Sequence, residues 1–595
     1  MPATALDSPN PSPQISPCDA REVVRGLSRV WHPRGAGVLG PLLGRVLAAR
    51  GLTDGPAAAA FLDPSLRHLH DPSGIPDLDR AAERLLEALR ADEPIVIYGD
   101  YDVDGITATA ILYHMLRAIR PGARVSSYVP HRLEEGYGLN SAALREIAAA
   151  GARVVVSVDC GITAVEPARA AREAGLDLII TDHHTPPASP DGLPGAYAVV
   201  HPRRHDSAYP FGDLCGAGVA YKLAWRLATM SCGGSRVSDE LRALLLELLA
   251  PAALGVIADV VPLVGENRVI ARFGLSKVKN SAIPGLRALV EASGLAGEKI
   301  SAEDVGFKMA PRLNACGRMG HAREAVELLT TAEGARAAEI ARELSRLNDR
   351  RKATERGIFD TACELAEAGG MTIPGRRAIV LSHPEWHAGV VGIVCSRLVE
   401  RYHRPVILLC EKEGICHGSG RSIETFNLHD GLAGCAGLLD SFGGHDMAAG
   451  MRLSAANLPA FTEAFTAVCN QRLSEHDLVG RVSYDAEAHP GELTVPAVTR
   501  LAQIGPFGRE NPAVRLRLRG VRIAGRPTTF GSMNKHLAFF AADGHGRALR
   551  IVGWNWAYAA PRIAACGRAD LLITPRLSTW GAPRVECELC DIAPA

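Results

Sequence analysis

The amino-acid sequence predicts an α/β protein with a parallel-sheet domain, a smaller α/β domain joined to it by a long helix, and an OB-like β-barrel at the C-terminus. Short apolar runs alternate with helix-length segments between about residues 92 and 200, as in a parallel sheet covered by helices. A helical pattern without proline covers residues 332–369, and after about residue 483 short strands with Gly and Pro turns replace helices. The 595 residues leave room for roughly three to five domains.

Alternating apolar runs and amphipathic segments define the first domain. The predicted strands are Ile95–Tyr98, Val125–Val129, Val154–Val158, Leu178–Thr181 and Ala198–Val200. The predicted helices are Ile106–Ile119, Ser141–Ala150, Ala164–Ala174, Gly216–Met230 and Glu240–Ile257. Because strand–helix–strand units place successive strands parallel, we expect one parallel sheet with helices on its faces.

The long helix should end at Gly369-Gly370, and its charged faces are typical of a helix that connects two domains. In the second domain we expect strands at Ala378–Ser382, Val406–Cys410 and Gly414–Gly418 and a helix at Gly389–Tyr402. The expected barrel strands are Val514–Ile523, His536–Ala541, Ala548–Trp554, Ala569–Leu577 and Pro583–Asp591. The expected bounds are 1–20 for a disordered tail, 21–330 for the first domain with its N-terminal segment, 331–370 for the connecting helix, 371–475 for the second domain and 476–595 for the barrel.

Composition excludes several classes of protein. Apolar residues make up 47% and charged residues 22% of the chain, which excludes a largely disordered chain, a collagen and a coiled-coil rod. The most apolar stretch, residues 241–263, contains Arg242, Glu247 and Asp259, which is too much charge for a membrane span. The N-terminus lacks a basic segment followed by an apolar one, so we expect no signal peptide.

Cysteine usage indicates a reducing compartment. The 14 cysteines are scattered, and the one close pair is Cys587 and Cys590. A single pair at this spacing is weak evidence for zinc, and in a strand its sulfurs face opposite sides. We therefore expect free thiols in a reducing cytoplasm.

Charge is balanced overall but not along the chain. The chain has 65 basic and 65 acidic side chains, whereas residues 501–595 have 13 basic and 6 acidic ones, hence a net charge of +7. A basic C-terminal module predicts a polyanionic ligand. Arg515, Arg517 and Arg519 alternate with leucines, so a strand here should have one basic and one apolar face. Aromatic residues that could stack on bases are Trp554, Trp556, Trp580, Phe539, Phe540 and Tyr558.

Acidic side chains gather where predicted strands end, at the edge of a parallel sheet that commonly binds ligands. They are Asp100, Asp102 and Asp104 after the first strand, Asp159 after the third, Asp182 with His183 and His184 after the fourth, and Asp259 after the helix at 240–257. One pair of carboxylates 4 Å apart costs about 4 kcal/mol at an effective dielectric of 20, so six converging carboxylates require cations. Oxygen ligands with one or two imidazoles favour Mn²⁺ or Mg²⁺ over zinc, and a carboxylate shared by two cations would make a two-metal hydrolase.

The order of these motifs resembles the DHH phosphoesterase superfamily, and within it the RecJ family of single-strand-specific exonucleases. The motifs of the first domain are Tyr-Gly-Asp-Tyr-Asp-Val-Asp-Gly at Tyr98–Gly105, Val-Asp-Cys-Gly at Val158–Gly161, Asp-His-His at Asp182–His184, Ala-Asp-Val-Val-Pro-Leu at Ala258–Leu263 and the segment Ala310–Met319. The segments His383–Val394, Gly418–Ser422 and Phe442–His445 resemble the DHHA1 domain of that family. The resemblance covers roughly residues 70–595.

The resemblance implies a role for each motif residue. The metal ligands would be Asp102, Asp104, Asp159, His183 and Asp259, with Asp159 bridging two cations. His184 would contact the scissile phosphate, with Asp100 and Asp182 in supporting catalytic roles. The phosphate-binding residues would be Arg421, Ser419, Ser422, His445, Arg312, Asn314, Arg318 and Arg132. Many relatives carry a histidine in place of Tyr98, so the first cation could lack one protein ligand.

The implied activity is hydrolysis of single-stranded DNA from its 5′ end to 5′-mononucleotides with Mn²⁺ or Mg²⁺. The resemblance also implies a role in DNA recombination and repair in the cytoplasm, with single-strand-binding protein and a RecQ-type helicase as partners. Two other functions stay open: a DHH phosphodiesterase for oligoribonucleotides or cyclic dinucleotides, and a catalytically inactive DHH scaffold that binds DNA. The basic C-terminal module argues against the first, and the complete set of acidic residues argues against the second.

Overall fold

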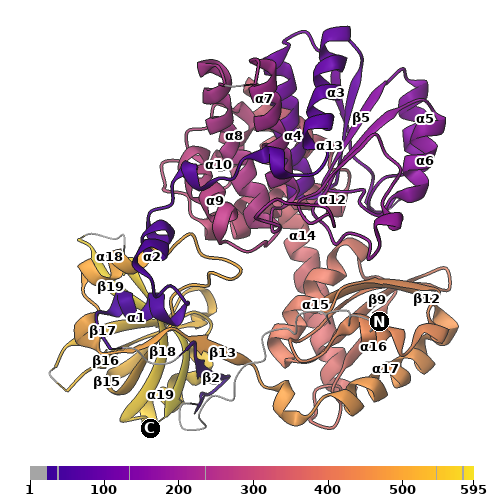
Figure 1. The fold of residues 1–595 in the computed structure, drawn as a ribbon. Helices are drawn as coiled ribbons and strands as arrows, with labels where there is room; N and C mark the ends of the chain where they lie inside the picture. The colour runs from indigo at the N-terminus through magenta and orange to yellow at the C-terminus, as the bar shows by residue number, and fades with distance from the viewer. Residues whose placement is uncertain are drawn as a thin grey trace, which may run out of the picture. The chain divides into compact units, whose positions relative to one another are not determined.

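The structure, a computed structural model, describes residues 23–35, 39–132, 134–234, 236–544, 546–578 and 582–594. These residues form two compact units, whose sheets and helices are drawn in Figure 1. We call residues 63–473 with 505–512 the core unit, and residues 1–62, 474–504 and 513–595 the barrel unit. The tail expected at residues 1–20 lies outside the described residues.

The core unit begins with a five-stranded parallel sheet in the order β4-β3-β5-β6-β7. Its strands are β3 (Ile95–Gly99), β4 (Val125–Tyr128), β5 (Val154–Val158), β6 (Asp177–Thr181) and β7 (Ala198–Val200). After β4 the chain returns past β3 to β5, so the direction of winding reverses between β3 and β5. In open α/β sheets such a switch point, at the carboxyl ends of the strands, is where ligands bind.

Helices cover both faces of this sheet because alternate side chains of each strand point in opposite directions. Ile95 and Ile97 share a core with the helices on one face, whereas Val96 and Tyr98 pack with those on the other. The first face carries α3 (Leu78–Ala91), α4 (Val103–Ile119), α7 (Gly216–Ser231) and α8 (Asp239–Ala258), and the second carries α5 (Ser141–Ala149) and α6 (Val165–Glu173). Figure 1 shows α3 and α5 on opposite sides of β5.

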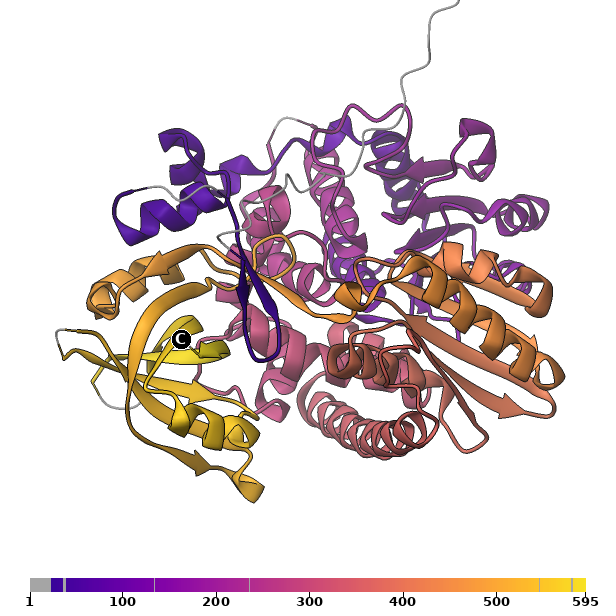
Figure 2. The ribbon, with the colours of Figure 1, turned by 90° about the horizontal axis from the view of Figure 1, so that it is seen from below.

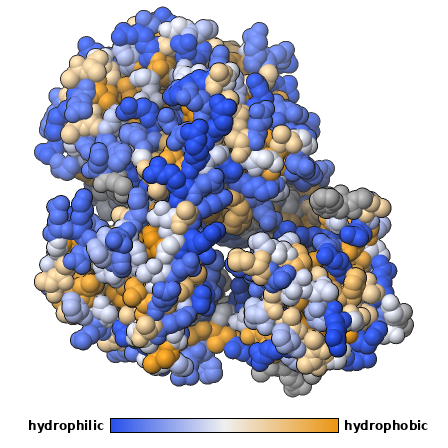
Figure 3. Space-filling view, turned by 180° about the vertical axis from the view of Figure 1, so that it is seen from behind, coloured by the Kyte–Doolittle hydropathy of each residue, from blue (hydrophilic) through white to orange (hydrophobic). Residues whose placement is uncertain are grey.

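Helix α8 is long and apolar enough to cross a membrane by length and composition alone. However, 56% of its apolar window is buried inside the protein, where it packs against α4, α7 and α9 (Gly265–Val278). Its composition is therefore that of a core helix. On the face drawn in Figure 3, hydrophobic residues are scattered among hydrophilic ones.

A helical segment follows the first sheet and leads to the long helix. It contains α9, α10 (Pro284–Ala292), α11 (Ala302–Asp304), a π-helical turn at Val305–Met309, α12 (Ala310–Met319) and α13 (Arg323–Thr330). The long helix is α14 (Gly334–Ala368), whose 35 residues extend roughly 50 Å. It packs against α10, α12 and α13 and also against α15 of the second domain, as expected of a connecting helix.

The second domain of the core unit is a five-stranded mixed sheet in the order β11-β12-β10-β9-β8. Its elements are β8 (Ile379–His383), α15 (Ala388–Tyr402), β9 (Val406–Lys412), β10 (Ile415–Arg421), α16 (Leu428–Ala433), β11 (Ser441–Gly444), β12 (Ala448–Ser454) and α17 (Leu458–Arg472). Only β8 and β9 pair in parallel among the described strands of this sheet. Helix α15 packs on β9 and β10.

The barrel unit contains a closed five-stranded barrel, coloured orange to yellow in Figure 2. The strands are β15 (Leu516–Phe530), β16 (His536–Ala542), β17 (Ala548–Gly553), β18 (Arg568–Ser578) and β19 (Arg584–Pro594), and β15 closes the barrel by pairing with both β16 and β18. The unit also contains β14 (Ala486–Ala488), α18 (Val495–Ala502) and α19 (Ala560–Ala565). All five predicted barrel strands are present. Throughout the described residues, the cysteines are free thiols.

The N-terminal segment belongs to the barrel unit, which corrects its predicted place in the first domain. It contains the hairpin β1 (Val24–Arg25) and β2 (Val30–Pro33), then α1 (Leu42–Ala49) and α2 (Gly55–Leu62). Strand β2 pairs in parallel with β13 (Arg481–Tyr484). The fully buried Trp31 donates a hydrogen bond from Nε1 to Asp591 at 2.9 Å. Contacts between residues hundreds of positions apart set this boundary, and no local pattern reveals them.

Candidate metal centre

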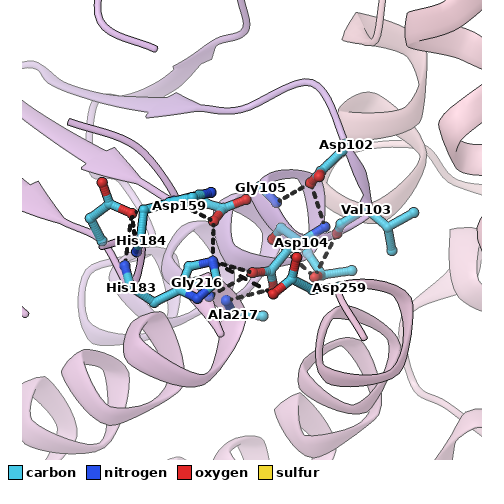
Figure 4. Close-up of polar contacts among 12 residues, drawn as sticks. Asp102, Val103, Asp104, Gly105, Asp159, His183, His184, Gly216, Ala217 and Asp259 are labelled. Carbon is cyan, nitrogen blue, oxygen red and sulfur yellow. Dashed lines mark hydrogen bonds and ion pairs between the residues drawn. The ribbon is translucent and has the colours of Figure 1, made fainter. Parts of the chain in front are cut away.

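Acidic loops and two helix ends meet at the carboxyl edge of the parallel sheet, beside the switch point (Figure 4). Asp102 caps the start of α4, where its carboxylate accepts hydrogen bonds from the backbone N–H groups of Asp104 and Gly105 at 2.9 and 3.2 Å. Asp159 follows β5 directly, and Asp259 ends α8. The predicted convergence of the acidic side chains is therefore present in the structure.

Three overlapping groups of ligand atoms lie here, each with its atoms within 4.8 Å of one another. The groups are Asp104, His183 and Asp259; Asp159, His183 and His184; and Asp100, Asp102 and Asp159. His183 Nε2 lies 3.1 Å from Asp159 Oδ1 and 3.6 Å from Asp259 Oδ2. Asp159 and His183 each belong to two groups, which is the arrangement that two cations with shared ligands require.

Three buried atoms of this centre make no hydrogen bond with any described residue: Asp100 Oδ1, Asp159 Oδ1 and His183 Nε2. Buried polar atoms are normally paired, so these atoms need another partner. Burial, together with neighbouring carboxylates, raises the pKa of Asp100 and Asp159 well above the usual range. The same causes raise the pKa of Asp259 to about 9. A hard divalent cation such as Mn²⁺ or Mg²⁺ fits this oxygen-rich donor set and would compensate its charge.

The raised carboxyl pKa values predict how stability depends on pH in EDTA. The folded state keeps protons that the unfolded chain releases above about pH 4, so the free energy of unfolding should fall as pH rises toward about 9, the folded pKa of Asp259. We expect the melting temperature in EDTA to fall from pH 6 to pH 8.5, and Mn²⁺ to raise it more at pH 8.5 than at pH 6. Asp259→Asn should flatten the EDTA profile. Identical profiles for the variant and the wild type would contradict this account.

The pKa values of the two adjacent histidines are shifted in opposite directions. Burial lowers the pKa of His183 to about 4, so its ring is neutral and Nε2 can bind a cation. Burial also disfavours a charged His184, but the 2.7 Å hydrogen bond to Asp182 and the charge of that carboxylate outweigh burial and raise the pKa to about 9. Although burial alone would raise the pKa of Asp182, the His184 contact lowers it to about 2. His183 therefore suits a metal ligand, and His184 suits a cation beside a phosphate.

Helices α7 and α8 approach the acidic residues closely. Asp104 accepts hydrogen bonds from the N–H groups of Gly216 and Ala217, at 2.6 and 2.9 Å, so its carboxylate lies on the N-terminus of α7. A Cβ atom on Gly216 would lie 2.6 Å from Asp159 Cβ. A Cβ atom on Gly255 of α8 would lie 2.5 Å from Asp104 Oδ1. Glycine at these two positions leaves the space that the carboxylates occupy.

Several supporting residues were not predicted from the sequence. The Tyr137 hydroxyl donates to the Asp159 carbonyl at 3.1 Å and lies 3.0 Å from His184 Nδ1. Arg203 donates to the His183 carbonyl at 2.6 Å. The bonds to Asp159 and His183 end on backbone carbonyls, which leave no pattern in the sequence. The Gly-Tyr-Gly stretch at 136–138 was the one local signal for Tyr137.

Tyr98, which stands where many relatives carry a histidine, does not face the acidic residues. Its side chain is fully buried and its hydroxyl donates to the Gly138 carbonyl at 3.1 Å. Its ring packs against Tyr128, with centroids 4.9 Å apart. Tyr98 is thus a core residue on the α5 and α6 face, and the structure gives it no place among the ligand groups.

Three arginines form a basic cluster beside the acidic residues. We define the arginine cluster as Arg132, Arg318 and Arg421. Burial lowers the pKa of Arg318 to about 10, and the nearby charge of Arg132 contributes to this. Burial and the charge of Arg132 also lower the pKa of Arg421. Asp100 and Asp102 are close enough for their carboxylates to interact with this cluster. None of the three forms an ion pair within the described part of the chain, so the cluster is suited to a phosphate.

The two domains of the core unit both contribute to the arginine cluster. Arg132 lies over the Tyr101 ring of the first domain, 4.7 Å from its centroid. Arg318 of α12 donates to the Gly389 carbonyl, at the start of α15, at 3.2 Å. Arg421 ends β10 in the second domain. The contact between α12 and α15 thus brings the predicted phosphate-binding motifs together.

Two predicted residues of α12 contact other segments of the core unit. Asn314 lies one turn before Arg318, and its side-chain oxygen accepts the Val103 N–H at 3.2 Å. Asn314 therefore holds the loop that carries Asp102 and Asp104. Arg312 lies six residues before Arg318, which places it on a different helix face. It donates to Ser345 Oγ of α14 at 3.0 Å and so connects two helices, and its phosphate-binding role stays a prediction.

The side chains of Ser419 and Ser422 have different surroundings. A Cβ atom on Gly392 of α15 would lie 3.3 Å from Ser419 Oγ and 3.4 Å from Arg421 Nη2, so both side chains approach the same helix. Ser422 is buried, and its hydroxyl donates to the Phe426 carbonyl at 2.6 Å. That hydroxyl stabilises a turn, and its role as a phosphate ligand stays a prediction.

His445 follows β11 and is exposed. Its backbone N–H donates to the Ala448 carbonyl at 2.8 Å, and Ala448 pairs with Arg421. His445 and Arg421 therefore lie at the same end of the sheet, separated by one strand.

The barrel unit corrects the prediction of a fully basic face on β15. Arg517 is only 8% exposed and pairs with Asp570 at 2.6 Å and Glu487 at 2.9 Å. Arg515 is half-buried and Arg519 is exposed. Of the aromatic residues, Trp554, Tyr558 and Phe540 are exposed, Phe539 and Trp556 are buried, and Trp580 lies outside the described residues. Three exposed rings therefore remain, together with Arg515 and Arg519, which form no ion pair with the described residues.

The protein families that match this chain do so in the same order as the domains described above. Models of three families match the chain: the DHH family N-terminal domain at residues 94–252, the DHHA1 domain at 375–471 and the RecJ OB domain at 484–591. The single-stranded-DNA-specific exonuclease RecJ of Bacillus subtilis is 40% identical over 474 residues, which cover 79% of this chain and 58% of that protein. The Escherichia coli protein of the same name is 36% identical over 485 residues, covering 80% and 82%. This chain thus spans less than two thirds of the B. subtilis relative.

Solved structures are similar over most of the chain. RecJ from Thermus thermophilus in complex with Mn²⁺ has a TM-score of 0.76 and 32% identity, covering 93% of this chain and 76% of that one. The same protein in complex with Mg²⁺ has a TM-score of 0.71. The fold and the acidic centre define a DHH phosphoesterase with a DHHA1 domain. The chain belongs to the RecJ family of single-stranded-DNA-specific exonucleases, so the family predicted from the sequence is confirmed.

Proposed function

We propose that this chain is a metal-dependent exonuclease that degrades single-stranded DNA from its 5′ end and releases 5′-mononucleotides. The observation that carries the proposal is a centre of overlapping ligand groups with a half-buried arginine cluster beside it, both within the core unit. The relatives are named as single-stranded-DNA-specific exonucleases, which supports the substrate. The T. thermophilus relative was solved with Mn²⁺ and with Mg²⁺, so we propose either cation for this chain.

We propose two sets of metal ligands. One set is Asp104, Asp159, His183 and Asp259, and the other is Asp100, Asp102 and Asp159, with Asp159 shared. Asp100 thereby moves from a supporting role to a ligand, because its Oδ1 is buried and unpaired. Bound divalent cations would supply charge neutralisation at a phosphoryl oxygen and lower the pKa of water.

Protein side chains beside the cations bind and orient the phosphate. His184, protonated through its contact with Asp182, places a positive ring beside the metal ligands. A fixed cation there stabilises negative charge that grows on the phosphoryl oxygens during hydrolysis. The Tyr137 hydroxyl also contacts His184 Nδ1, at 3.0 Å, and its ring packs edge-on against the His184 ring, so Tyr137 helps to fix the orientation of that ring.

The arginine cluster fixes the end of the strand. Arg421 is planar, half-buried and free of ion pairs within the described residues, and Ser419 lies beside it. We propose that it binds the terminal 5′ phosphate through two parallel hydrogen bonds. Arg318 and Arg132 would bind the phosphates between that end and the cations.

Arg421→Ala tests this polarity directly. With Mn²⁺, a 5′-phosphorylated single strand labelled at its 5′ end should release labelled mononucleotide first, and a 3′-labelled strand should shorten stepwise. The variant should lower kcat/KM on the phosphorylated strand about 10- to 100-fold, the size of a lost pair of charge-assisted hydrogen bonds. The loss on the same strand with a 5′ hydroxyl should be much smaller, because that strand lacks the phosphate. Gel electrophoresis of labelled products measures both.

Arg452→Ala is a matched control, since it removes an exposed arginine from the neighbouring strand β12. Equal losses on both substrates would refute the phosphate assignment, and release of 3′ label first would refute the polarity. Turnover confined to dinucleotides or cyclic dinucleotides would support the small-substrate function. Strand binding without hydrolysis in Mn²⁺ and Mg²⁺ would support an inactive scaffold.

We also propose a role in DNA recombination and repair in the cytoplasm. An enzyme that needs single strands depends on a helicase to produce them, and single-strand-binding protein covers them once formed. We therefore propose a RecQ-type helicase and single-strand-binding protein as partners.

A further inference from the structure

A loop from the C-terminal region belongs to the core unit. Residues 505–512, here called the inserted loop, leave and re-enter the barrel unit but pack on the core. The Leu263 N–H donates to the Arg509 carbonyl at 2.9 Å. A Cβ atom on Gly508 would lie 2.7 Å from Leu263 Cδ1, so the loop approaches this leucine closely.

The inserted loop is held in shape by its own contacts. Asn511 is 1% exposed, and its side-chain amide donates to the Pro506 carbonyl at 2.8 Å. The Gly508 N–H donates to the Asn511 carbonyl at 2.9 Å. These bonds connect the two ends of the loop, so the backbone of Arg509 occupies a defined position on the core unit.

Arg509 lies at the rim of the metal centre. Its backbone bonds to Leu263, four residues after Asp259. Its side chain is exposed and makes no hydrogen bond or ion pair with the described residues. Its charge lies within electrostatic range of the Asp259 carboxylate. A fixed loop thus holds an unpaired cation beside a centre that we propose binds phosphate.

Arg509 and the arginine cluster lie near different ligand groups. The arginine cluster interacts with Asp100 and Asp102, whereas Asp259 belongs to the group with Asp104 and His183. A strand whose 5′ end is held by the arginine cluster would pass the ligand group of Asp100 and Asp102 first and then the group that contains Asp259. Arg509 is placed to meet that continuation.

We propose that Arg509 binds a phosphate of the substrate strand on the 3′ side of the cut, so that the inserted loop is part of the substrate site. The inference rests on the proposed function for the direction of the strand. Arg509 thereby has a role at the metal centre, although the sequence predicted that it belongs to the barrel.

Arg509→Ala tests the proposal on an eight-nucleotide, 5′-phosphorylated single strand. KM should rise about five- to tenfold with kcat changed less than twofold, because the contact is made in the bound and reacting states alike. For binding in EDTA, the slope of log K against log salt should become shallower by about 0.7, the value for one phosphate on a single strand. Arg509→Lys should restore most of the affinity, because a charge suffices at a phosphate. The Mn²⁺ affinity, measured by calorimetry, should change less than twofold.

Arg242→Ala is the matched control. Arg242 is an exposed arginine near the start of α8, roughly 25 Å along the helix from Asp259. Its substitution therefore removes the same charge at a position far from the metal centre. Equal effects of the two variants, or an unchanged salt slope for Arg509→Ala, would overturn the proposal. A large change in Mn²⁺ affinity that accounts for the rise in KM would also overturn it, since Arg509 would then act through Asp259. The salt slope in EDTA tests the Arg509 contact even if the wild-type protein cleaves no strand. Absence of cleavage by the wild type would instead contradict the proposed function.

Discussion

Asp159→Asn should abolish hydrolysis while leaving the fold intact. Asp159 belongs to two of the three ligand groups, so its loss affects both proposed cations. Asparagine keeps the shape of the side chain but removes its charge. We expect kcat in saturating Mn²⁺ to fall more than about 10³-fold, which exceeds the typical cost of one lost electrostatic contact to a transition state. Strand binding, measured by fluorescence anisotropy, should stay within about threefold, because the arginine cluster is unchanged.

The same variant has a second expected effect, on stability. Burial and neighbouring carboxylates raise the pKa of Asp159, so its charge is unfavourable without a cation. In EDTA at pH 8, Asp159→Asn should melt no lower than the wild type, and Mn²⁺ should raise its melting temperature much less. Asp191→Asn, which changes an exposed acid elsewhere in the core unit, should alter neither activity nor melting. Hydrolysis within tenfold of the wild type would contradict a shared ligand at Asp159.

The sequence predicts the site well where the chemistry depends on strand ends. Apolar runs identify the buried strands, and the carboxyl ends of parallel strands must meet at one edge. Asp159 and Asp182 therefore had to lie near Asp104 once the strands were identified. We propose a role for Asp100 that differs from the predicted one, because an alternating loop has several acids on one side. Only the folded backbone shows which oxygen is buried without a hydrogen bond to the described residues.

Contacts between distant segments could not be predicted from local patterns. Strand β2 has four residues, and its pairing with β13 leaves no periodic signal. The alternation around Arg517 correctly placed its side chain opposite the leucines, but it could not show that Asp570 and Glu487 lie there to neutralise it. The inserted loop contacts Leu263 through a backbone carbonyl, which any residue type provides.

Removing the barrel unit should weaken the binding of long strands and leave the metal centre intact. All proposed metal ligands and the arginine cluster lie within residues 63–473. Because residues 23–62 pack with the barrel unit, the deletion must remove them together with residues 474–595. A cut after residue 480 alone would leave Trp31 without Asp591 and β2 without β13. The correct fragment is therefore residues 63–473.

We expect the 63–473 fragment to bind a 40-nucleotide strand at least about tenfold more weakly at moderate salt, with a shallower salt dependence. The lost module carries the exposed rings of Trp554 and Tyr558, and stacking contributes about 1–3 kcal/mol per base. It also carries the net positive charge of the C-terminal region, whose phosphate contacts set the salt slope. The proper reference is full-length Arg509→Ala, since the fragment also lacks the inserted loop. On the eight-nucleotide strand the two proteins should have similar kcat in Mn²⁺, because both keep the same ligands. If the fragment binds the long strand with the affinity and salt slope of that reference, the barrel is not a DNA-binding module and the small-substrate function is favoured.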